Sequence, residues 1–167
     1  LLKLADLYGA DYVLDGELLV VDSAGKPLDR KTGNGILSKG VKGTMSDKEA
    51  AMVRVTLWDA IPFTGFQTGV YKTPYNERFM KLMQNVDFLK GISAIEHLVD
   101  IVWTKEVKTQ LEAQNIFEKF LAEGQEGTIL KSKTNIWEDK RSKTQIKFKG
   151  ELECDLRIVG IEEGTGK

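Results

Sequence analysis

The stretch "YVLDGELLVVD", residues 12–22, has the composition of a buried strand but carries two carboxylates in its middle. The apolar and β-branched residues around Asp15, Gly16 and Glu17 predict a sheet strand, whereas the glycine weakens a strand and lets another group approach its backbone closely. Strand alternation predicts that Asp15 and Glu17 share one face. Carboxylates near a strand end can hold a hard cation such as Mg²⁺, and the simpler alternative is that "DGE" is only a turn.

Composition limits the possible classes of protein. The 167 residues, 41% hydrophobic and 29% charged, predict a globular domain that buries its own core. The 24 basic and 25 acidic residues give no global attraction to nucleic acid or membrane, so such a partner must meet a local patch. The single cysteine, Cys154, excludes an internal disulfide and fits the reducing cytoplasm, where we expect the protein. No apolar run approaches the roughly 20 residues of a membrane span.

Strand-like and helix-like segments alternate without a regular βαβ period. We expect a long polar loop at 31–46, after which Ser46 and Glu49 form a capping box that opens a short helix at 47–53. Further helices are expected from Pro74 onward and up to a stop at Gly124. The expected inward residues of the first helix are Phe79, Leu82 and Met83. The second is expected from residues at helical spacing, namely Leu111, Ile116, Phe117, Phe120 and Leu121. The other expected strands are 53–61, 97–104, "GTILKS", "TQIKFK" and "CDLRIVGIE". This order favours the α+β class, with mainly antiparallel sheets flanked by helices.

Three more short patterns indicate possible chemistry. In "EGQEGTILK", Glu126 stands where a strand begins and Lys131 where it ends. In "QIKFK", Lys147 and Lys149 share one strand face and Phe148 takes the other, and lysines in such a pair can bind phosphate oxygens. In "TLWDA", Trp58 stands beside a carboxylate. The structural alternatives are lysines on the solvent face of an edge strand and a tryptophan in the core. The only histidine, His97, has no Ser or Cys nearby that would suggest catalysis.

The order of these patterns resembles the adenylation domain of ATP-dependent DNA ligases, which are covalent nucleotidyltransferases. "LDGEL" is similar to the family's third motif, "LWDA" to its aromatic-Asp motif, and "EGTILK" with "KFK" to its fourth and fifth motifs. Ligases of the T-even phage type are most similar in three further segments, which are "RKTGNGILSKGVKGT", "KRSK" and "DLRIVGI". The resemblance implies a nucleotidyltransferase (ATP-grasp-like) fold, with ATP as AMP donor and Mg²⁺ or Mn²⁺ as metal. It also implies nicked duplex DNA as partner, a monomer, no membrane, and the host cytoplasm if a phage encodes the protein.

The resemblance implies roles for individual residues. Glu17 contacts the ribose or metal of bound AMP, Trp58 stacks on adenine, and Glu126 binds the metal. Lys147 and Lys149 contact the α-phosphate side of the nucleotide. Lys131 also stands at a nucleotide-binding motif position, although strict alternation places it opposite Glu126 unless the strand bends.

One family motif is absent from these residues. The family's first motif is Lys-x-Asp-Gly, whose lysine attacks the α-phosphate of ATP, whereas the only Asp-Gly here, Asp15-Gly16, has Val13 two positions before the aspartate. We therefore expect the chain to begin after that motif, as part of a longer enzyme, and to lack a catalytic residue of its own. Residues 1–152 are then a partial adenylation domain, and residues 153–167 are the linker and first strand of an OB-fold domain.

Contact with DNA is expected from local charge. Residues 131–149 hold seven basic residues against two acidic ones, which favours phosphate backbones without sequence readout. Candidate DNA contacts are Arg141 and Lys143 in this stretch, and Lys39 and Lys42 in the glycine-rich segment, where a solvated loop is the alternative. Two other functions remain open: an RNA ligase or mRNA capping nucleotidyltransferase, and an inactive relative that only binds nucleic acid.

Overall fold

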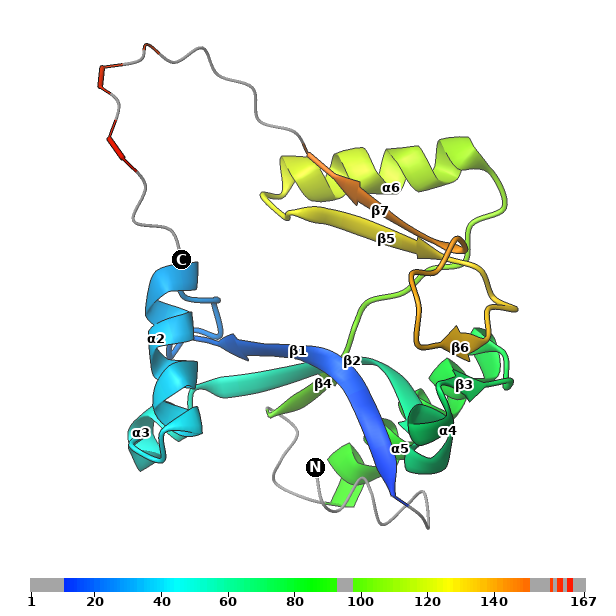
Figure 1. Cartoon of the computed structure of the whole chain (residues 1–167), viewed down its shortest axis with the longest axis horizontal. Helices are drawn as coiled ribbons and strands as arrows, with labels where there is room; N and C mark the ends of the chain where they lie inside the picture. The colour runs from blue at the N-terminus through cyan, green and yellow to red at the C-terminus, as the bar shows by residue number, and fades with distance from the viewer. Residues whose placement is uncertain (1–10, 93–97, 151–156, 158, 161, 164–167) are drawn as a thin grey trace. The chain divides into compact units, whose positions relative to one another are not determined.

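The protein is described by a computed structural model for residues 11–92, 98–150, 157, 159–160 and 162–163 (Figure 1). The chain forms two compact units. The first consists of Leu1–Glu106 with Lys131–Thr144, and the second of Val107–Leu130 with Gln145–Lys167. His97 lies outside the described residues, and so does most of the predicted strand "CDLRIVGIE".

A long antiparallel ribbon forms the centre of the first unit. Strand β1 (Tyr12–Val20) pairs antiparallel with β2 (Val53–Pro62), and β4 (Val99–Ile101) pairs parallel with the other side of β2. The predicted α+β class with mainly antiparallel sheets is confirmed, with this one short parallel pair added. β4 is shorter than the predicted strand at 97–104, because only three of its residues pair with β2.

A β-bulge interrupts the pairing of β1 with β2 at the "LDGEL" motif. Asp15 is opposite Asp59, but Gly16 is opposite Leu57, so the register shifts between Asp15 and Gly16. The unpaired residue is Trp58 of β2, so β1 itself gains no residue here. Asp15 and Glu17 are both exposed, and their common face stays a prediction.

Gly16 is required by close contact with β2. A Cβ at this position would lie 2.5 Å from the carbonyl oxygen of Thr56 and 3.2 Å from Cα of Leu57. We expect Gly16→Ala to destabilise the protein by about 1–3 kcal/mol, as overpacking does, because backbone atoms cannot move aside as a flexible side chain can. Urea unfolding measures this, with Gly35→Ala as control, since a Cβ at Gly35 meets nothing within 4 Å. Equal losses in the two variants would contradict the assignment.

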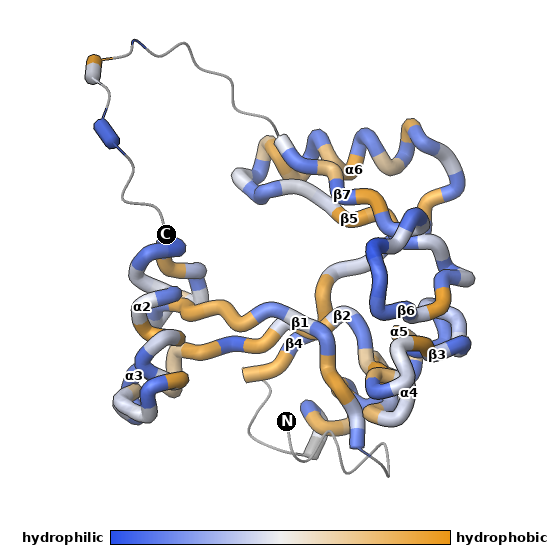
Figure 2. The backbone as a smooth tube through the Cα atoms, viewed as in Figure 1, coloured by the Kyte–Doolittle hydropathy of each residue, from blue (hydrophilic) through white to orange (hydrophobic). Residues whose placement is uncertain are grey.

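Helix α5 (Tyr75–Ile92) closes the core of the first unit. Leu82, Val86 and Leu89 are buried against Leu57 and Val99. Figure 2 shows the apolar segments (orange) that run along β1 and β2. Phe79 and Leu82 point inward as predicted, but Met83 is 37% exposed, so its predicted burial was wrong. The buried stripe runs along i, i+4 and i+7 from Leu82, and Met83 lies beside it.

Helix α2 (Arg30–Val41) replaces the long loop that was expected at 31–46. The Asp29 side chain caps it by accepting a hydrogen bond from the Thr32 N–H at 3.0 Å. Gly33 is buried, and a Cβ built there would reach Val20 of β1 at 3.9 Å, so tertiary packing outweighs the low helix propensity of glycine. The predicted capping box is confirmed in α3 (Asp47–Ala50), where Ser46 and Glu49 bond each other's backbone N–H.

A pair of short strands attaches residues 132–144 to the rest of the first unit. α4 (Phe63–Thr68) leads into β3 (Val70–Tyr71), which pairs antiparallel with β6 (Trp137–Glu138). The rings of Phe66 and Trp137 lie 5.7 Å apart between centroids. α4 was not predicted from the sequence, because six residues are too few to show a helical period.

The second unit contains α6 (Gln110–Ala122), β5 (Gly127–Lys131, whose last residue belongs to the first unit) and β7 (Gln145–Lys149). The predicted helix and its stop are confirmed: Thr109 caps the N-terminus and Gly124 has a φ of 79°. Phe117 packs on Phe148 at 5.8 Å between centroids, whereas Leu111 in the first turn is 67% exposed.

Candidate functional site

In the first unit the Lys131 side chain lies against two aromatic rings. Its Nζ is 4.6 Å from the centroid of Tyr75 and 5.9 Å from that of Trp58, both within the range of a cation–π contact. Lys131 ends β5, Trp58 lies in β2 and Tyr75 begins α5, so three elements build the contact. Trp58 is only half-buried.

A buried ion pair lies directly beside this aromatic site. Asp59 and Arg78 are 3% and 4% exposed. The Arg78 guanidinium donates two hydrogen bonds to the carboxylate, from Nε to Oδ1 at 2.8 Å and from Nη2 to Oδ2 at 2.7 Å. Such a two-pronged pair fixes orientation as well as charge. Asp59 follows Trp58 in β2, so the ion pair holds the strand that presents the ring.

Burial and neighbouring charges act on the Lys131 amine in opposite directions. Burial lowers the pKa of Lys131, and Arg78 adds to this, whereas the carboxylates of Asp59 and Asp15 oppose it. Burial also raises the pKa of the Tyr75 phenol, with Asp59 acting in the same direction. Asp15, beside the bulge in the β1–β2 pairing, therefore acts electrostatically on this site.

These side chains suit a planar, electron-rich ligand with a negative charge nearby. The Trp58 ring offers a stacking face, and the Lys131 ammonium offers hydrogen-bond donors and positive charge. Glu17 is exposed on β1 opposite Thr56. A separate cavity of about 220 Å³ lies beside Arg78 and is lined by Tyr12, Tyr71 and Lys81 among others, but neither Trp58 nor Lys131 lines it.

The second unit brings together three of the other predicted site residues. Lys147 and Lys149 are exposed on β7 while Phe148 between them is half-buried, so the predicted alternation is confirmed. Nζ of Lys149 lies 3.5 Å from Oε2 of Glu126, just before β5. Acidic and basic predicted ligands are therefore neighbours within this unit.

Gly127 sets the approach of β5 to β7 and was not singled out from the sequence. Its φ is 143°, and a Cβ there would collide with the Phe148 carbonyl oxygen. No side chain fits this position, so the glycine of "EGT" keeps Glu126 beside the lysine strand. The signal available in the sequence was the glycine itself at a strand start.

The described residues contain no group of three or more His, Cys, Asp or Glu that could hold a metal ion. Mg²⁺ commonly binds through one or two carboxylates, with waters and substrate phosphates supplying the remaining oxygens. Glu17 and Glu126 fit that mode of binding as single ligands. Among the described helices none is long and apolar enough to span a bilayer.

Several lysines of the predicted basic regions have acidic partners. The distance from the lysine Nζ to a glutamate Oε is 2.5 Å for Lys39 and Glu49. It is 2.9 Å for Lys133 and Glu106, and 2.8 Å for Lys140 and Glu138. Because Glu106 is remote in sequence from Lys133, a local count of charges overestimates the free positive charge. Lys42, Arg141 and Lys143 are exposed.

Arg78 and Tyr75 are the members of the site that the sequence analysis missed. A signal for Arg78 existed, because it precedes the buried residues Leu82 and Val86 at a spacing of four and so lies on the inward face of a helix. A charged residue on that face requires a partner, and the carboxylate of "LWDA" is the matching buried acid.

Comparison with known proteins identifies the family of this chain. The family described as ATP dependent DNA ligase domain matches residues 2–149. The DNA ligases of Enterobacteria phages T4 and T6 are each 37% identical over 133 residues, which is 79% of this chain and 26% of each relative. The chain thus spans about a quarter of the length of these curated relatives.

Solved structures show the same fold. The ATP-dependent DNA ligase of bacteriophage T7, in complex with ATP, has a TM-score of 0.64 at 24% identity, covering 83% of this chain and 44% of that one. A structure titled "Pmar-Lig_Pre." has a TM-score of 0.66 at 21% identity, covering 94% and 34%. With four motifs in order and a family match over most of its length, the chain belongs to the ATP-dependent DNA ligase domain family.

Proposed function

We propose that this chain is the nucleotide-binding part of an ATP-dependent DNA ligase that seals nicks in duplex DNA. The observation that supports this most directly is the Trp58 ring, half-buried and contacted by Lys131, at the aromatic position of the family's motifs. A core tryptophan would be enclosed by apolar side chains, whereas this ring lies beside a cation and the Asp59–Arg78 pair. A planar base can stack on such a ring.

The other predicted residues have matching tasks in this proposal. Trp58 stacks on adenine, Lys131 contributes positive charge at the nucleotide, and Glu17 contacts the ribose or metal. Lys147 and Lys149 bind phosphate oxygens, and the Lys149–Glu126 pair rearranges when phosphate competes for the ammonium. Glu17 in the first unit and Glu126 in the second would each be able to offer a carboxylate to Mg²⁺ or Mn²⁺, which would supply charge neutralisation at phosphates.

The chemistry that follows is phosphoryl transfer in three steps. The amine of a lysine attacks the α-phosphorus of ATP, forming lysyl-AMP and releasing pyrophosphate. AMP then passes to a 5′-phosphate at the nick, and the 3′-hydroxyl displaces AMP to form the phosphodiester. We propose that the attacking lysine belongs to a Lys-x-Asp-Gly segment of the full-length enzyme, since none occurs in these 167 residues. Positioning and charge neutralisation by the residues above lower the barrier.

DNA binding in this proposal uses exposed cations in the first unit. Arg141 and Lys143 contact phosphates, as do Lys39 and Lys42 at the end of α2. Lys39 must exchange its carboxylate partner Glu49 for a phosphate, so its contribution is smaller than its charge suggests. Affinity falls steeply with salt, as for any contact made to phosphates.

The full-length protein is proposed to act as a cytoplasmic monomer, with residues 153–167 leading into an OB-fold domain. The test of the function is a sealing assay on three nicked substrates, one all-DNA, one with an RNA strand at the nick and one all-RNA. Sealing of the DNA nick in preference to the others supports the proposal. Preference for RNA ends indicates an RNA ligase, GTP-dependent labelling indicates a capping enzyme, and binding without AMP transfer indicates an inactive relative.

Trp58 offers a test that separates stacking from core packing. We expect Trp58→Ala in the full-length enzyme to weaken ATP binding by roughly 1–3 kcal/mol, the range for aromatic–base stacking, whereas Trp58→Phe keeps a ring and most of the affinity. Calorimetry measures both, with thermal melts alongside, because truncating a core aromatic itself costs about 3–5 kcal/mol of stability. A Trp58→Ala variant that melts early but binds ATP normally would show that Trp58 is a core residue only.

A further inference from the structure

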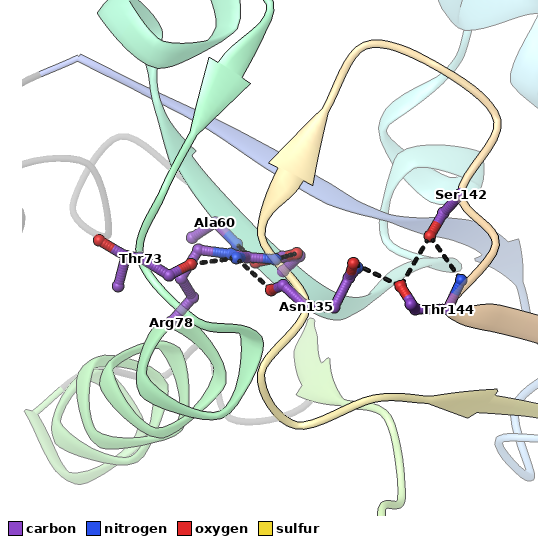
Figure 3. Close-up of polar contacts among 7 residues, drawn as sticks. Ala60, Thr73, Arg78, Asn135, Ser142 and Thr144 are labelled. Atoms are coloured by element: carbon purple, nitrogen blue, oxygen red, sulfur yellow. Dashed lines mark hydrogen bonds and ion pairs between the residues drawn. The ribbon is translucent and has the colours of Figure 1, made fainter.

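Arg78 joins three separate parts of the first unit through one buried guanidinium. Besides the two bonds to Asp59, Nη1 donates to the Thr73 carbonyl at 2.5 Å and to the Asn135 carbonyl at 3.1 Å (Figure 3). Asp59 lies in β2, Thr73 precedes α5, and Asn135 lies in the segment that follows β5. The Arg78 side chain is 1% exposed, so water cannot replace these partners.

The segment held by Arg78 is the one that begins beside Lys131. The Asn135 carbonyl also accepts from the Tyr75 N–H at 2.8 Å, and the Asn135 side chain accepts from the Thr144 hydroxyl at 2.5 Å (Figure 3). Ser132 N–H donates to the Thr144 carbonyl at 3.0 Å and closes the segment at its base. Lys131 is therefore attached to a loop whose position depends on Arg78 and Tyr75.

Arg78 also binds both oxygens of the Asp59 carboxylate, whose charge acts on Lys131. Oδ1 of Asp59 accepts from Arg78 Nε and from the Ala60 N–H at 2.9 Å, and Oδ2 accepts from Arg78 Nη2. Lys131 instead lies on the rings of Tyr75 and Trp58. The Asp59 charge acts on the Lys131 amine even so, since it opposes the lowering of its pKa.

We propose that Arg78 is a positioning residue of the nucleotide site: by binding both oxygens of Asp59 it keeps the Lys131 ammonium on the Trp58 and Tyr75 rings. Without it, the free carboxylate of Asp59 draws Lys131 into an ion pair and away from the face where the base stacks. The effect on nucleotide binding rests on the proposed function. The competition of Arg78 and Lys131 for the Asp59 carboxylate does not require a nucleotide. The charged groups that act on Lys131 are Asp59, Asp15 and Arg78.

The test compares three variants of the full-length protein: Arg78→Met, Asp59→Asn combined with Arg78→Met, and Val86→Ala. Val86 is a control from the same helix, 1% exposed in the core and without part in the network. The first readout is acylation of the Lys131 amine as a function of pH, followed by mass spectrometry of its peptide. The second is the adenylation rate, corrected for the folded fraction from thermal melts.

We expect Arg78→Met to shift the Lys131 acylation midpoint to higher pH, because an unpaired Asp59 carboxylate stabilises the ammonium. The rate of adenylation should fall on the order of 10²-fold, as for a displaced group in other sites. Asp59→Asn in the Arg78→Met background should return the midpoint toward that of the unmutated protein. Val86→Ala should leave it unchanged.

An Arg78→Met midpoint equal to that of Val86→Ala, or one that Asp59→Asn does not restore, overturns the inference. The acylation measurement needs no nucleotide, so its outcome does not depend on whether the protein binds ATP. Failure of the unmutated full-length protein to bind ATP or to form an AMP adduct counts against the proposed function instead.

Discussion

Incubation of the 167-residue chain with Mg²⁺ and α-labelled ATP is expected to leave it without a covalent label on a denaturing gel. The nucleophile of the proposed reaction is a lysine two positions before an Asp-Gly, and Val13 holds that position before Asp15-Gly16. An isopropyl side chain cannot attack phosphorus. The same experiment on the full-length protein should give a labelled band, which makes the difference between the two all-or-none.

Lys131 makes this experiment informative in either direction. Burial lowers its pKa, so a larger share of its amine is neutral at a given pH than for an ordinary lysine. A label on the isolated chain that disappears in Lys131→Met would identify Lys131 as the nucleophile and overturn the assignment to an upstream lysine. Circular dichroism of the unlabelled chain shows whether it was folded during the assay.

Replacement of Glu126, Lys147 or Lys149 in the second unit should produce the next largest loss of activity. In the full-length enzyme, Glu126→Ala, Lys147→Ala and Lys149→Ala are each expected to slow adenylation or sealing by about 10²-fold or more, as loss of one electrostatic stabiliser does elsewhere. The reason is that each residue acts, directly or through the metal, on negative charge that reorganises at the phosphates. Single-turnover kinetics with labelled ATP and with pre-adenylated DNA assign each loss to a step.

The matched control for this series is Lys119→Ala. Lys119 belongs to the same unit, is exposed on α6 and pairs with Glu123 at 3.7 Å, four residues along the helix. An exposed pair of this kind contributes little to stability, so the rate should stay close to that of the unmutated enzyme. A loss at Lys119 as large as at Lys147 and Lys149 would point to general destabilisation of the unit and contradict the site assignment.

Local patterns in the sequence were sufficient for much of the secondary structure. The apolar run of β2, the helical spacing in α5 and α6, the Gly124 stop and the Ser46–Glu49 capping box all depend on neighbours within a few residues. The alternation of Lys147, Phe148 and Lys149 is equally local. Family resemblance rested on the order of such short motifs, which is why it could be recognised without a structure.

Tertiary structure alone decided the features that depend on distant contacts. α2 is a helix despite its glycines, because Gly33 packs on Val20 of β1. The bulge that leaves Trp58 of β2 without a partner residue in β1 appears only when the two strands pair.

The centre of the site also depends on contacts between residues far apart in the sequence. Asp59 and Arg78 are 19 residues apart in the chain, and Lys131 reaches Trp58 and Tyr75 from a still more distant strand. Sequence showed an acid beside Trp58, and it gave no partner for that acid among the basic residues of the chain. Only the folding of α5 and the segment after β5 against β2 removes water from both groups, and burial makes their pairing obligatory.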